Sequence, residues 1–334
     1  MPHKVAFSFE DGVTRIVEAR DDQLVIDAAA RAGVILPFGC RDGNCGACKS
    51  FCEAGQYKHQ AYSYNAMTTR EARQRYVLTC KMVALSDCAI RVSSDSNACN
   101  VQPQTMSVTV EEVRKLSPSS IGLAIRMAPG AGLPFLPGQY VNMGVPGSTQ
   151  MRPYSFSSLP KDGVVEFLIR NLPGGVMSGY LFDRAKPGDT LSISGPYGAF
   201  YLRDMARPQL FLAGGTGLAP FLSMLEKISS MEPKYPIRLI YGVTNDVDLV
   251  EVEKLEALAA KIPGFSFTTC VADQSSRHSH KGFVTHHIAD EHLNGGDVDV
   301  YLCGPPPMVD AAHAAFAERG VKPARLFFEK FNPA

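Results

Sequence analysis

The sequence predicts a multi-domain protein in which an α+β domain, an antiparallel β-barrel and an α/β domain with a parallel sheet follow one another along the chain. Three observations carry this prediction. The chain has 334 residues, which is enough for two or three domains. Four of its nine cysteines lie between residues 40 and 52. In the middle of the chain, strand patterns follow one another without helix patterns between them, whereas strand and helix patterns alternate after residue 207.

The first part of the chain, residues 1–96, reads as short strands around a compact helix. Strands are expected at Lys4 to Phe9 and at Thr14 to Ala19, and a helix at Val25 to Ala32 that ends at Gly33. The segment SNACNVQPQ that follows is polar and has no periodicity, so residues 97–104 are predicted to form a linker.

The second part, residues 105–204, has the pattern of short antiparallel strands. Leu123, Ile125 and Met127 alternate with less apolar neighbours, and turn signals such as LPG, VPGS, LPKDG and KPGD recur at short intervals. This spacing predicts a small antiparallel β-barrel.

The third part, residues 205–334, alternates between strands and helices, which predicts a parallel sheet with helices on both faces. Helices are expected at Pro220 to Ile228, Val252 to Lys261, Val284 to Ala289 and Pro307 to Arg319. The strands between them read QLFLA, IRLIYGV, FSFTTCVA, VDVYLC and RLFFEKF.

The composition excludes several classes of protein. The chain carries 33 basic and 33 acidic residues and is 45% hydrophobic, so it is neither disordered nor equipped with a broad basic surface for nucleic acid or an acidic membrane. Glycine and proline interrupt the longest apolar run, Leu210 to Leu225, so we expect no membrane span. The first residues lack the features of a secretory signal, and we expect a cytoplasmic location. In the reducing cytoplasm, an odd number of cysteines suggests that some of them bind metal or take part in redox chemistry.

Four cysteines have the spacing of a plant-type ferredoxin. Cys40, Cys45 and Cys48 stand at C-x4-C-x2-C, and Cys80 follows Cys48 after 31 intervening residues. This pattern predicts a [2Fe-2S] cluster held by four thiolates, in a β-grasp-like ferredoxin domain. Glycines at 43 and 46 suit a loop whose backbone N–H groups approach the sulfurs closely.

Other interpretations of these cysteines stay open. The cysteines could form a zinc knuckle or a set of buried thiols, although the second C-x2-C typical of zinc is absent. Cys52 could replace Cys80 as the fourth ligand. Cys88 and Cys99 are interpreted as incidental. Ala47 stands where a hydroxyl residue often occurs, so a hydrogen bond that tunes the potential could be missing.

A second group of residues suits a flavin. In MRPYSFSS, Arg152 and Tyr154 share one face of a strand, so a phosphate-binding cation and a ring that can lie on a flat heterocycle are presented together. Downstream, Gly174, Gly175 and Ser178 stand at an expected helix start, where free N–H groups suit a pyrophosphate. Each segment alone could instead be an ordinary strand or turn.

With these two motifs the chain resembles the ferredoxin-NADP reductase superfamily, whose flavin fingerprint is R-x-Y-S followed by G-x-x-S. The resemblance implies that Arg152 contacts the FAD phosphates, that Tyr154 stacks on the isoalloxazine and that Ser155 lies near its reactive N5. It also implies cofactor contacts from Arg170 and Met177 in the same segments.

A third group suits a nicotinamide nucleotide. LFLAGGTGLAP is a strand followed by a glycine-rich turn and a helix, which allows close backbone approach to phosphate. The resemblance implies that Gly214, Gly215, Thr216, Gly217 and Pro220 form the nicotinamide-domain turn.

Further residues follow other strands of the same domain. Asp246 and Asp248 could accept hydrogen bonds from a ribose and repel a 2'-phosphate, which favours NADH over NADPH, or could cap the next helix. Cys303 and Gly304 end another strand, where ligands bind in parallel sheets. The resemblance implies that Cys303 lies near the nicotinamide ring, with Pro305 beside it, whereas a small buried cysteine without a role is the alternative.

The end of the chain and a histidine-rich segment complete the candidates. In FFEKF, the resemblance implies that Glu329 and Phe331 reach the flavin, and the alternative is an edge strand. The catalytic candidates are therefore Tyr154, Ser155, Cys303 and Glu329. Five histidines lie in RHSHKGFVTHHIADEHL, which we interpret as a solvated loop because no metal-site pattern matches.

Over its whole length the chain resembles the reductase components of benzoate-type aromatic-ring dioxygenases. The resemblance implies that NADH reduces FAD, that FAD reduces the [2Fe-2S] cluster, and that the cluster feeds a terminal Rieske non-haem iron oxygenase. Two alternatives are the reductase of a di-iron hydroxylase and a redox sensor without enzymatic activity.

Overall fold

The computed structural model describes residues 2–96, 98 and 101–331. Internal packing divides the chain into two compact units, residues 1–104 with 195–199, and residues 105–194 with 200–334. Residues 97, 99 and 100 of the predicted linker, and with them Cys99, lie outside the described residues. Within the described part of the chain, no helix is long and apolar enough to cross a membrane.

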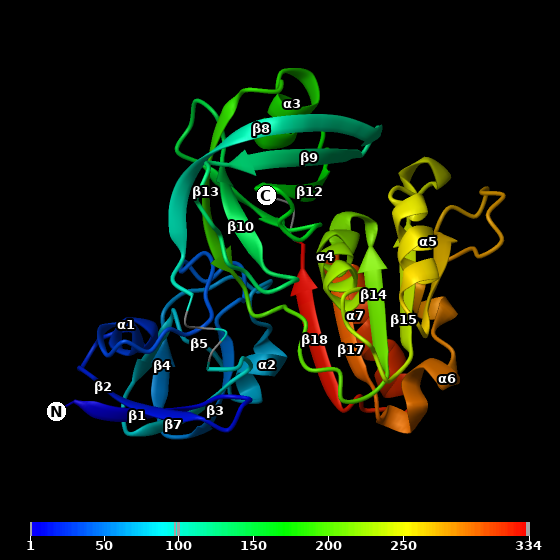
Figure 1. Ribbon diagram of the computed structural model, residues 1–334. Coiled ribbons are helices and arrows are strands. Elements are labelled where there is room, and N and C mark those ends of the chain that lie inside the picture. The colour runs from blue at the N-terminus through cyan, green and yellow to red at the C-terminus, as the bar shows by residue number, and fades with distance from the viewer. Residues whose placement is uncertain (1, 97, 99–100, 332–334) are drawn as a thin grey trace. The chain divides into compact units, whose positions relative to one another are not determined.

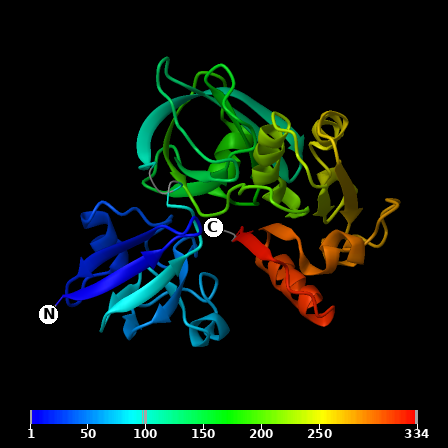
Figure 2. The same cartoon turned by 60° about the horizontal axis from the view of Figure 1, so that its bottom comes forward.

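The first unit is built on a mixed five-stranded sheet with the order β2-β1-β7-β3-β5 (Figure 2). β1 and β7 pair in parallel, and the other neighbours pair antiparallel. Its strands are β1 (His3–Ser8), β2 (Thr14–Ala19), β3 (Lys49–Ala54), β5 (Tyr76–Leu78) and β7 (Cys88–Val92). β4 (Tyr57–His59) and β6 (Met82–Ala84) form a separate pair.

Helix α1 (Val25–Arg31) closes the core of this sheet, because its apolar side chains and the inward side chains of β1 belong to one buried cluster. A short helix, α2 (Thr69–Arg73), begins with a capping box between Thr68 and Glu71. The observed β1 starts and ends one residue before the predicted strand. The predicted α+β fold of this region is confirmed.

The second part of the chain forms a six-stranded sheet with the order β11-β10-β13-β8-β9-β12. A bridge between Phe156 and Phe167 joins the chain after β11 to β12, so the two ends of the strand order meet, as a barrel requires (Figure 1). Its strands are β8 (Gln104–Ser117), β9 (Ser120–Met127), β10 (Tyr140–Gly144), β11 (Met151–Ser155), β12 (Val164–Arg170) and β13 (Thr190–Tyr197). One helix, α3 (Val176–Asp183), follows β12. The alternating residues of β9 lie in the core, as predicted.

The third part contains a parallel five-stranded sheet with the order β16-β15-β14-β17-β18. Its strands are β14 (Gln209–Gly214), β15 (Ile237–Val243), β16 (Phe265–Val271), β17 (Asp299–Gly304) and β18 (Arg325–Lys330). Its α-helices are α4 (Ala219–Ile228), α5 (Val252–Lys261), α6 (Asp290–Leu293) and α7 (Pro306–Glu318). The expected helix at Val284 to Ala289 is a 3-10 turn, η3 (Val284–His287).

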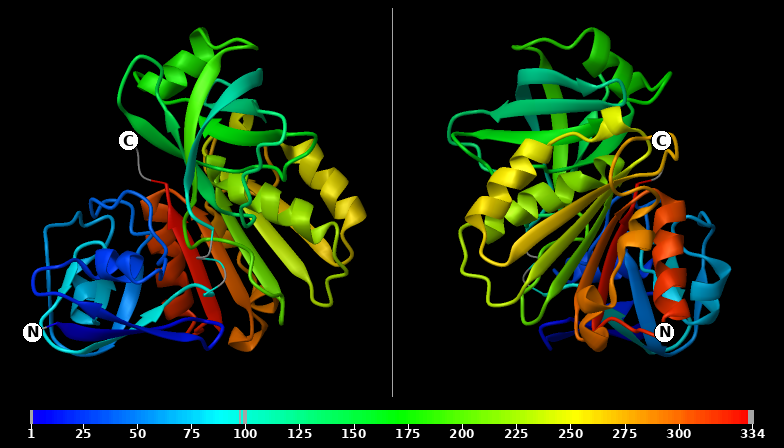
Figure 3. Two further views of the ribbon diagram at one scale, coloured as in Figure 1. Left: turned by 60° about the vertical axis from the view of Figure 1, so that its left-hand side comes forward. Right: turned by 90° about the vertical axis from the view of Figure 1, so that its right-hand side faces the viewer.

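Both faces of this sheet are covered, because β14 and β17 send alternate side chains in opposite directions. Phe211 and Tyr301 pack with α4 and α5, whereas Leu212 and Leu302 pack with α7. Figure 3 shows α4 and α5 on one side of the sheet and α7 on the other. The predicted parallel sheet with two covered faces is confirmed.

The barrel and the parallel sheet belong to the same compact unit, and polar contacts join them. The buried Ser223 hydroxyl of α4 accepts a hydrogen bond from the Gly138 N–H of the barrel at 3.1 Å. Ser117 and Ser119, at the turn between β8 and β9, donate to the Asp248 carboxylate. These contacts fix the barrel motifs relative to the ends of the parallel strands.

Candidate functional site

The predicted cluster loop aims backbone N–H groups at cysteine sulfurs. Asn44 and Cys45 donate to Cys40 Sγ at 3.3 Å, and Cys40 and Ala47 donate to Cys45 Sγ at 3.4 Å. The N–H of Ala47 thus contacts a sulfur although its side chain has no hydroxyl. Such contacts stabilise thiolates and suit sulfur atoms that ligate iron.

Glycines make this loop possible. Gly43 and Gly46 have φ angles of 85° and 76°, in the left-handed region that other residues avoid. A Cβ on Gly43 would lie 2.9 Å from Cβ of Tyr62, and one on Gly46 would lie 3.0 Å from the carbonyl oxygen of Ala66. The loop is therefore packed so closely against the 62–66 segment that side chains do not fit.

The four predicted ligands meet as two pairs. Cys48 Sγ and Cys80 Sγ are 3.2 Å apart and buried, whereas Cys40 and Cys45 are exposed and each donates its backbone N–H to the sulfur of the other. No three potential ligands among the described residues converge on a single metal ion. Two thiolate pairs suit two irons, one pair for each iron, so the residues fit a [2Fe-2S] cluster.

Cys52, the rival fourth ligand, is occupied elsewhere. Its thiol donates to the carbonyl oxygen of Ala54 at 3.2 Å and lies beside the thiol of Cys88. The structure thus pairs Cys80 with Cys48 and places Cys52 with a different thiol.

The predicted flavin residues lie on neighbouring parts of the barrel. Arg152 is half-buried on β11, and its guanidinium donates to Gln150 Oε1 at 2.8 Å and to the carbonyl oxygen of Met151 at 3.1 Å. Among the described residues it is paired with no carboxylate, so its charge is available to a phosphate. Tyr154 lies two residues away on the same strand, and burial raises the pKa of its phenol, which therefore stays protonated.

The start of α3 has the features of an anion site. Gly175 is the N-cap residue and offers no side chain to the first N–H groups of this helix. The buried Ser178 hydroxyl instead holds the preceding turn, because it accepts from the N–H of Leu172 and donates to its carbonyl oxygen, both at 3.1 Å. The Met177 side chain lies in the barrel core, and Arg170 is exposed at the end of β12.

The catalytic candidates converge although they come from distant parts of the chain. Ser155 Oγ donates to Glu329 Oε2 at 3.3 Å across 174 positions of sequence. Glu329 on β18 is also the register partner of Cys303 on β17. Burial raises the pKa of Glu329 to about 8, although the hydrogen bond from Ser155 acts in the opposite direction. Burial and the nearby Glu329 also raise the pKa of the Cys303 thiol.

The glycine-rich turn after β14 packs directly on the end of β17. A Cβ on Gly217 would lie 2.3 Å from the carbonyl oxygen of Cys303. Cβ atoms on Gly214 and Gly304 would lie 2.4 and 2.8 Å from Met308 Sδ. Backbone therefore meets backbone at the carboxyl end of the sheet, where ligands bind in this architecture.

The first turn after this strand is a 3-10 helix, η1 (Gly215–Leu218), and not the start of an α-helix. Thr216 is half-buried within it, and Pro220 lies in the first turn of α4. Pro305 is the N-cap of α7. Phe331 is half-buried, and its N–H donates to the carbonyl oxygen of Gly304 at 2.9 Å.

The two aspartates expected at a ribose have different surroundings. Both lie in η2 (Asp246–Asp248), directly after β15. Asp248 is half-buried and accepts from Ser117, Ser119 and the side-chain amide of Asn245. Asp246 is exposed and accepts from Ser276 at 2.7 Å. Asp248 is therefore engaged in joining the two domains, and Asp246 is the freer candidate.

The histidine-rich segment contains no metal-binding group among the described residues. The nitrogens of His278 contact Thr269 and the carbonyl oxygen of His280, and His287 contacts the carbonyl oxygen of Lys281.

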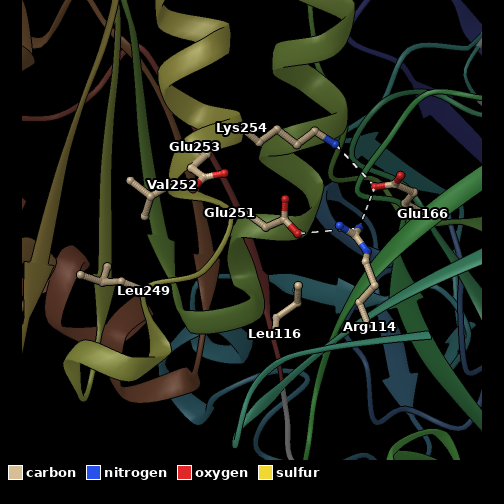
Figure 4. Close-up of a pocket in the computed structure, with 8 residues that line it drawn as sticks. All are labelled: Arg114, Leu116, Glu166, Leu249, Glu251, Val252, Glu253 and Lys254. Carbon is tan, nitrogen blue, oxygen red and sulfur yellow. Dashed lines mark ion pairs between the residues drawn. The ribbon is translucent and has the colours of Figure 1, made fainter. Parts of the chain in front are cut away.

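One charged cavity was not foreseen from the sequence. It has a volume of about 610 Å³, and Figure 4 shows oppositely charged side chains around it. Arg114 lies 3.6 Å from Glu166 and 4.0 Å from Glu251, and Lys254 lies 2.8 Å from Glu226. Because β8 and β12 supply one side and α5 the other, this ion-pair network joins the barrel to the sheet domain. None of the predicted cofactor residues lines it.

Three family models match successive parts of the chain. The 2Fe-2S iron-sulfur cluster binding domain matches residues 8–85, the oxidoreductase FAD-binding domain residues 107–201, and the oxidoreductase NAD-binding domain residues 211–314. The three sites described above lie mainly within these three ranges.

Full-length relatives share this arrangement. The chain is 55% identical to the toluate 1,2-dioxygenase electron transfer component of Pseudomonas putida, over 99% of both chains. It is 44% identical to the 2-halobenzoate 1,2-dioxygenase electron transfer component of Burkholderia cepacia, over 100% of this chain and 99% of that one. Among solved structures, the Amycolatopsis cytochrome P450 reductase GcoB has a TM-score of 0.75 at 31% identity and covers 98% of this chain and 99% of its own.

Proposed function

Because the chain belongs to the family of electron transfer components of aromatic-ring 1,2-dioxygenases, we propose that it carries electrons from NADH through FAD and a [2Fe-2S] cluster to a terminal Rieske non-haem iron oxygenase acting on a benzoate-type acid. It is a flavin oxidoreductase with an iron-sulfur, an FAD-binding and a NAD-binding domain. The observation that carries the proposal is the full-length identity of 55% to the toluate relative.

The three bound groups supply the redox chemistry. NADH delivers two electrons as a hydride, FAD can accept a pair and release single electrons, and the cluster carries one electron at a time. The protein binds and orients these groups and controls the protons near them.

On the barrel, the Arg152 guanidinium, which pairs with no carboxylate among the described residues, and the open start of α3 suit the negative charges of the FAD phosphates. Tyr154 offers its ring from the same face of β11. We propose that Ser155 and Glu329 face the flavin, with the Glu329 carboxyl holding a proton below a pH of about 8 that its hydrogen bond with Ser155 Oγ can pass on.

On the parallel sheet, Gly214, Gly217 and Gly304 keep side chains out of the place where β14 and β17 end, so a nucleotide can approach the backbone. We propose that Cys303, at this edge and next to Glu329, lies beside the nicotinamide ring. In the first unit, the loop around Cys40 and Cys45 holds thiolates by backbone N–H groups.

Reduction potentials favour the proposed direction of transfer. Plant-type ferredoxin clusters have potentials near about -400 mV, and Rieske centres lie at about -150 mV or above. A Rieske partner would therefore accept electrons downhill. Because NADH and reduced thiols are cytoplasmic reactants, we propose that the reaction takes place in the cytoplasm.

The test is a reconstitution. The purified chain with bound iron and FAD is mixed with NADH and either a Rieske oxygenase of the benzoate type or a di-iron hydroxylase. We expect substrate-dependent oxygen uptake with the Rieske oxygenase and little with the hydroxylase, and the reverse result would overturn the choice of partner. Failure of NADH to bleach the flavin would instead favour the sensor without enzymatic activity.

The preference for NADH rests on Asp246, since Asp248 is engaged with the barrel. Loss of one hydrogen bond between a charged group and the ribose costs about 1.5–3 kcal/mol, so Asp246→Ala should raise KM for NADH by roughly tenfold or more. The KM for NADPH should rise less or fall, because the repulsion of a 2'-phosphate is removed. Equal effects on both coenzymes would contradict this role.

A further inference from the structure

Two buried cysteines of the first unit have no part in the proposed electron path. Cys52 lies on β3 and Cys88 on β7, two neighbouring antiparallel strands. A β-bulge interrupts the register between Cys52 and Ala54. The Cys52 thiol donates to the carbonyl oxygen of Ala54 at 3.2 Å and the Cys88 thiol to that of Ser86 at 3.3 Å, and the two sulfurs are close enough to act on each other electrostatically. The backbone beside them is tightly packed, because a Cβ on Gly55 would lie 2.6 Å from Cys88 Sγ.

The guanidinium of Arg75 is fixed against this thiol pair. It donates to the carbonyl oxygens of Cys52 and Gly55, both at 2.8 Å, and to Cys52 Sγ at 3.5 Å. Among the described residues, Arg75 has no carboxylate partner. A cation held by two carbonyl oxygens beside a sulfur is an arrangement that stabilises a thiolate.

The two thiols consequently differ in acidity. The neighbouring Cys88 thiol, followed by Arg75, lowers the pKa of Cys52 to about 6 against the opposing effect of burial. The neighbouring Cys52 and burial raise the pKa of Cys88. The other ionisable groups that act on the pair are Tyr57, whose ring lies under the Arg75 guanidinium, and Asp87.

We propose that Cys52 and Cys88 form a peroxide-sensitive dithiol that is oxidised reversibly to a disulfide. In the first step, the Cys52 thiolate attacks one oxygen of hydrogen peroxide. The O–O bond breaks, one proton is taken up, and a sulfenic acid and water are formed. In the second step, the Cys88 sulfur attacks the sulfenic sulfur, the S–S bond forms, and the thiol proton leaves with the hydroxide as water. Two thiols and one peroxide thus give one disulfide and two waters.

Peroxide can reach Cys52 and Cys88 only from the solvent-exposed edge of the first unit around Arg75. Arg75 is exposed, and the neighbouring residues 53, 54, 56 and 87 are exposed as well. Local opening of this edge admits a small molecule such as peroxide to thiols that are buried in the closed structure. A source of peroxide, the reaction of reduced flavin with dioxygen when no partner takes the electrons, rests on the proposed function.

The main test uses the whole protein with its cluster and FAD. It is treated anaerobically with added hydrogen peroxide, free thiols are blocked with N-ethylmaleimide, and the digest is analysed by mass spectrometry. We expect a peptide that links Cys52 to Cys88, that disappears after dithiothreitol, and that forms before the cluster absorbance falls. Free Cys52 and Cys88 after the cluster has bleached would overturn the proposal. This arm needs neither NADH nor an oxygenase, so it is independent of the proposed function.

Two variants test the roles of the individual groups. Cys88→Ser should leave Cys52 as a sulfenic acid that dimedone traps, because the resolving thiol is missing. Arg75→Gln should slow disulfide formation at pH 7 by about threefold or more, because less Cys52 is ionised. Arg91→Gln is the matched control, since Arg91 lies exposed on β7 beside Glu53, and it should react like the wild type. Equal rates in both arginine variants would contradict the role of Arg75.

Discussion

Ser155 and Glu329 come from distant parts of the chain and form a hydrogen-bonded pair whose carboxyl can hold a proton. Glu329 lies on β18 opposite Cys303 of β17, its carboxyl accepts a hydrogen bond from Ser155, and burial raises its pKa. Cys303, its neighbour across the strands, stays a thiol for the same reason. A neutral edge suits the arrival of a nucleotide that must bring its ring close to a flavin.

The raised pKa of Glu329 predicts a pH dependence of stability. Between its ordinary value near 4.5 and about 8, the folded state binds more protons than the unfolded state, so the free energy of unfolding should fall as the pH rises through this window. Below this window the carboxyl is protonated in both states and costs nothing. Glu329→Gln should remove this slope, and urea unfolding from pH 4.5 to 8 measures it. An unchanged slope would show that another group is responsible.

At Arg152, the expectation concerns cofactor retention. A charged hydrogen bond to phosphate contributes about 1.5–3 kcal/mol, so Arg152→Ala should weaken FAD binding by about 10- to 100-fold. Flavin content after gel filtration and titration of the apoprotein measure the change. Arg126→Ala on β9 is the control, because Arg126 is paired with Glu111 on the barrel surface. Unchanged flavin content in Arg152→Ala would exclude the phosphate role.

At the scale of elements, the carboxyl ends of β14 and β17 form the proposed nucleotide site, and their packing limits how close a nucleotide can come. The 3-10 turn η1 brings Gly217 against the backbone of Cys303, and Gly214 against Met308. The strands themselves are apolar and buried on both faces, so their ends are held rigidly. The proposed nucleotide site is therefore formed by backbone that two packed helices support.

Gly217→Ala tests this close approach. Its Cβ would lie 2.3 Å from the carbonyl oxygen of Cys303, so either η1 or β17 must move. We expect a loss of about 1–3 kcal/mol in the free energy of unfolding and a higher KM for NADH. Gly179→Ala in α3 is the control, because nothing lies within 4 Å of its Cβ and alanine favours a helix. Equal behaviour of the two variants would refute the packing argument.

At the scale of the whole molecule, the three sites occur in the order in which the family models match the chain. The barrel and the parallel sheet form one compact unit, joined by the Asp248 contacts and by the ion pairs of Lys254. Hydride transfer needs its two cofactors in contact, and two domains packed into a single unit suit this requirement. Electrons can travel farther than hydrides, so the cluster can reside in a separate unit.

Cys80→Ser separates the two stages of the reaction. The variant should lose the cluster spectrum and electron delivery to an oxygenase, but it should keep NADH-dependent reduction of ferricyanide through FAD. Cys52→Ser is the control and should keep the cluster, because Cys52 contacts Cys88 and not Cys48. A cluster that survives in Cys80→Ser and disappears in Cys52→Ser would reverse the ligand assignment.

Local sequence patterns determined the fold class and the three kinds of site. Each of the three site motifs is contained in a short segment, in which residue type and spacing set the local backbone conformation. These motifs are the spacing of Cys40, Cys45 and Cys48, the R-x-Y-S strand and the glycine-rich turn. For the same reason the alternation in β9 and the strand–helix order after residue 207 were read correctly. One helix was wrong, because the segment at Val284 forms the 3-10 turn η3 instead.

Tertiary structure alone decided which distant side chains meet. It brought Glu329 to Ser155, engaged Asp248 with the barrel, paired Cys52 with Cys88 beside Arg75, and built the charged cavity around Arg114. These contacts depend on strand register, a β-bulge and the packing of the barrel on the sheet. Such features arise from the joint burial of segments far apart in the chain, and no periodicity within a single segment encodes them.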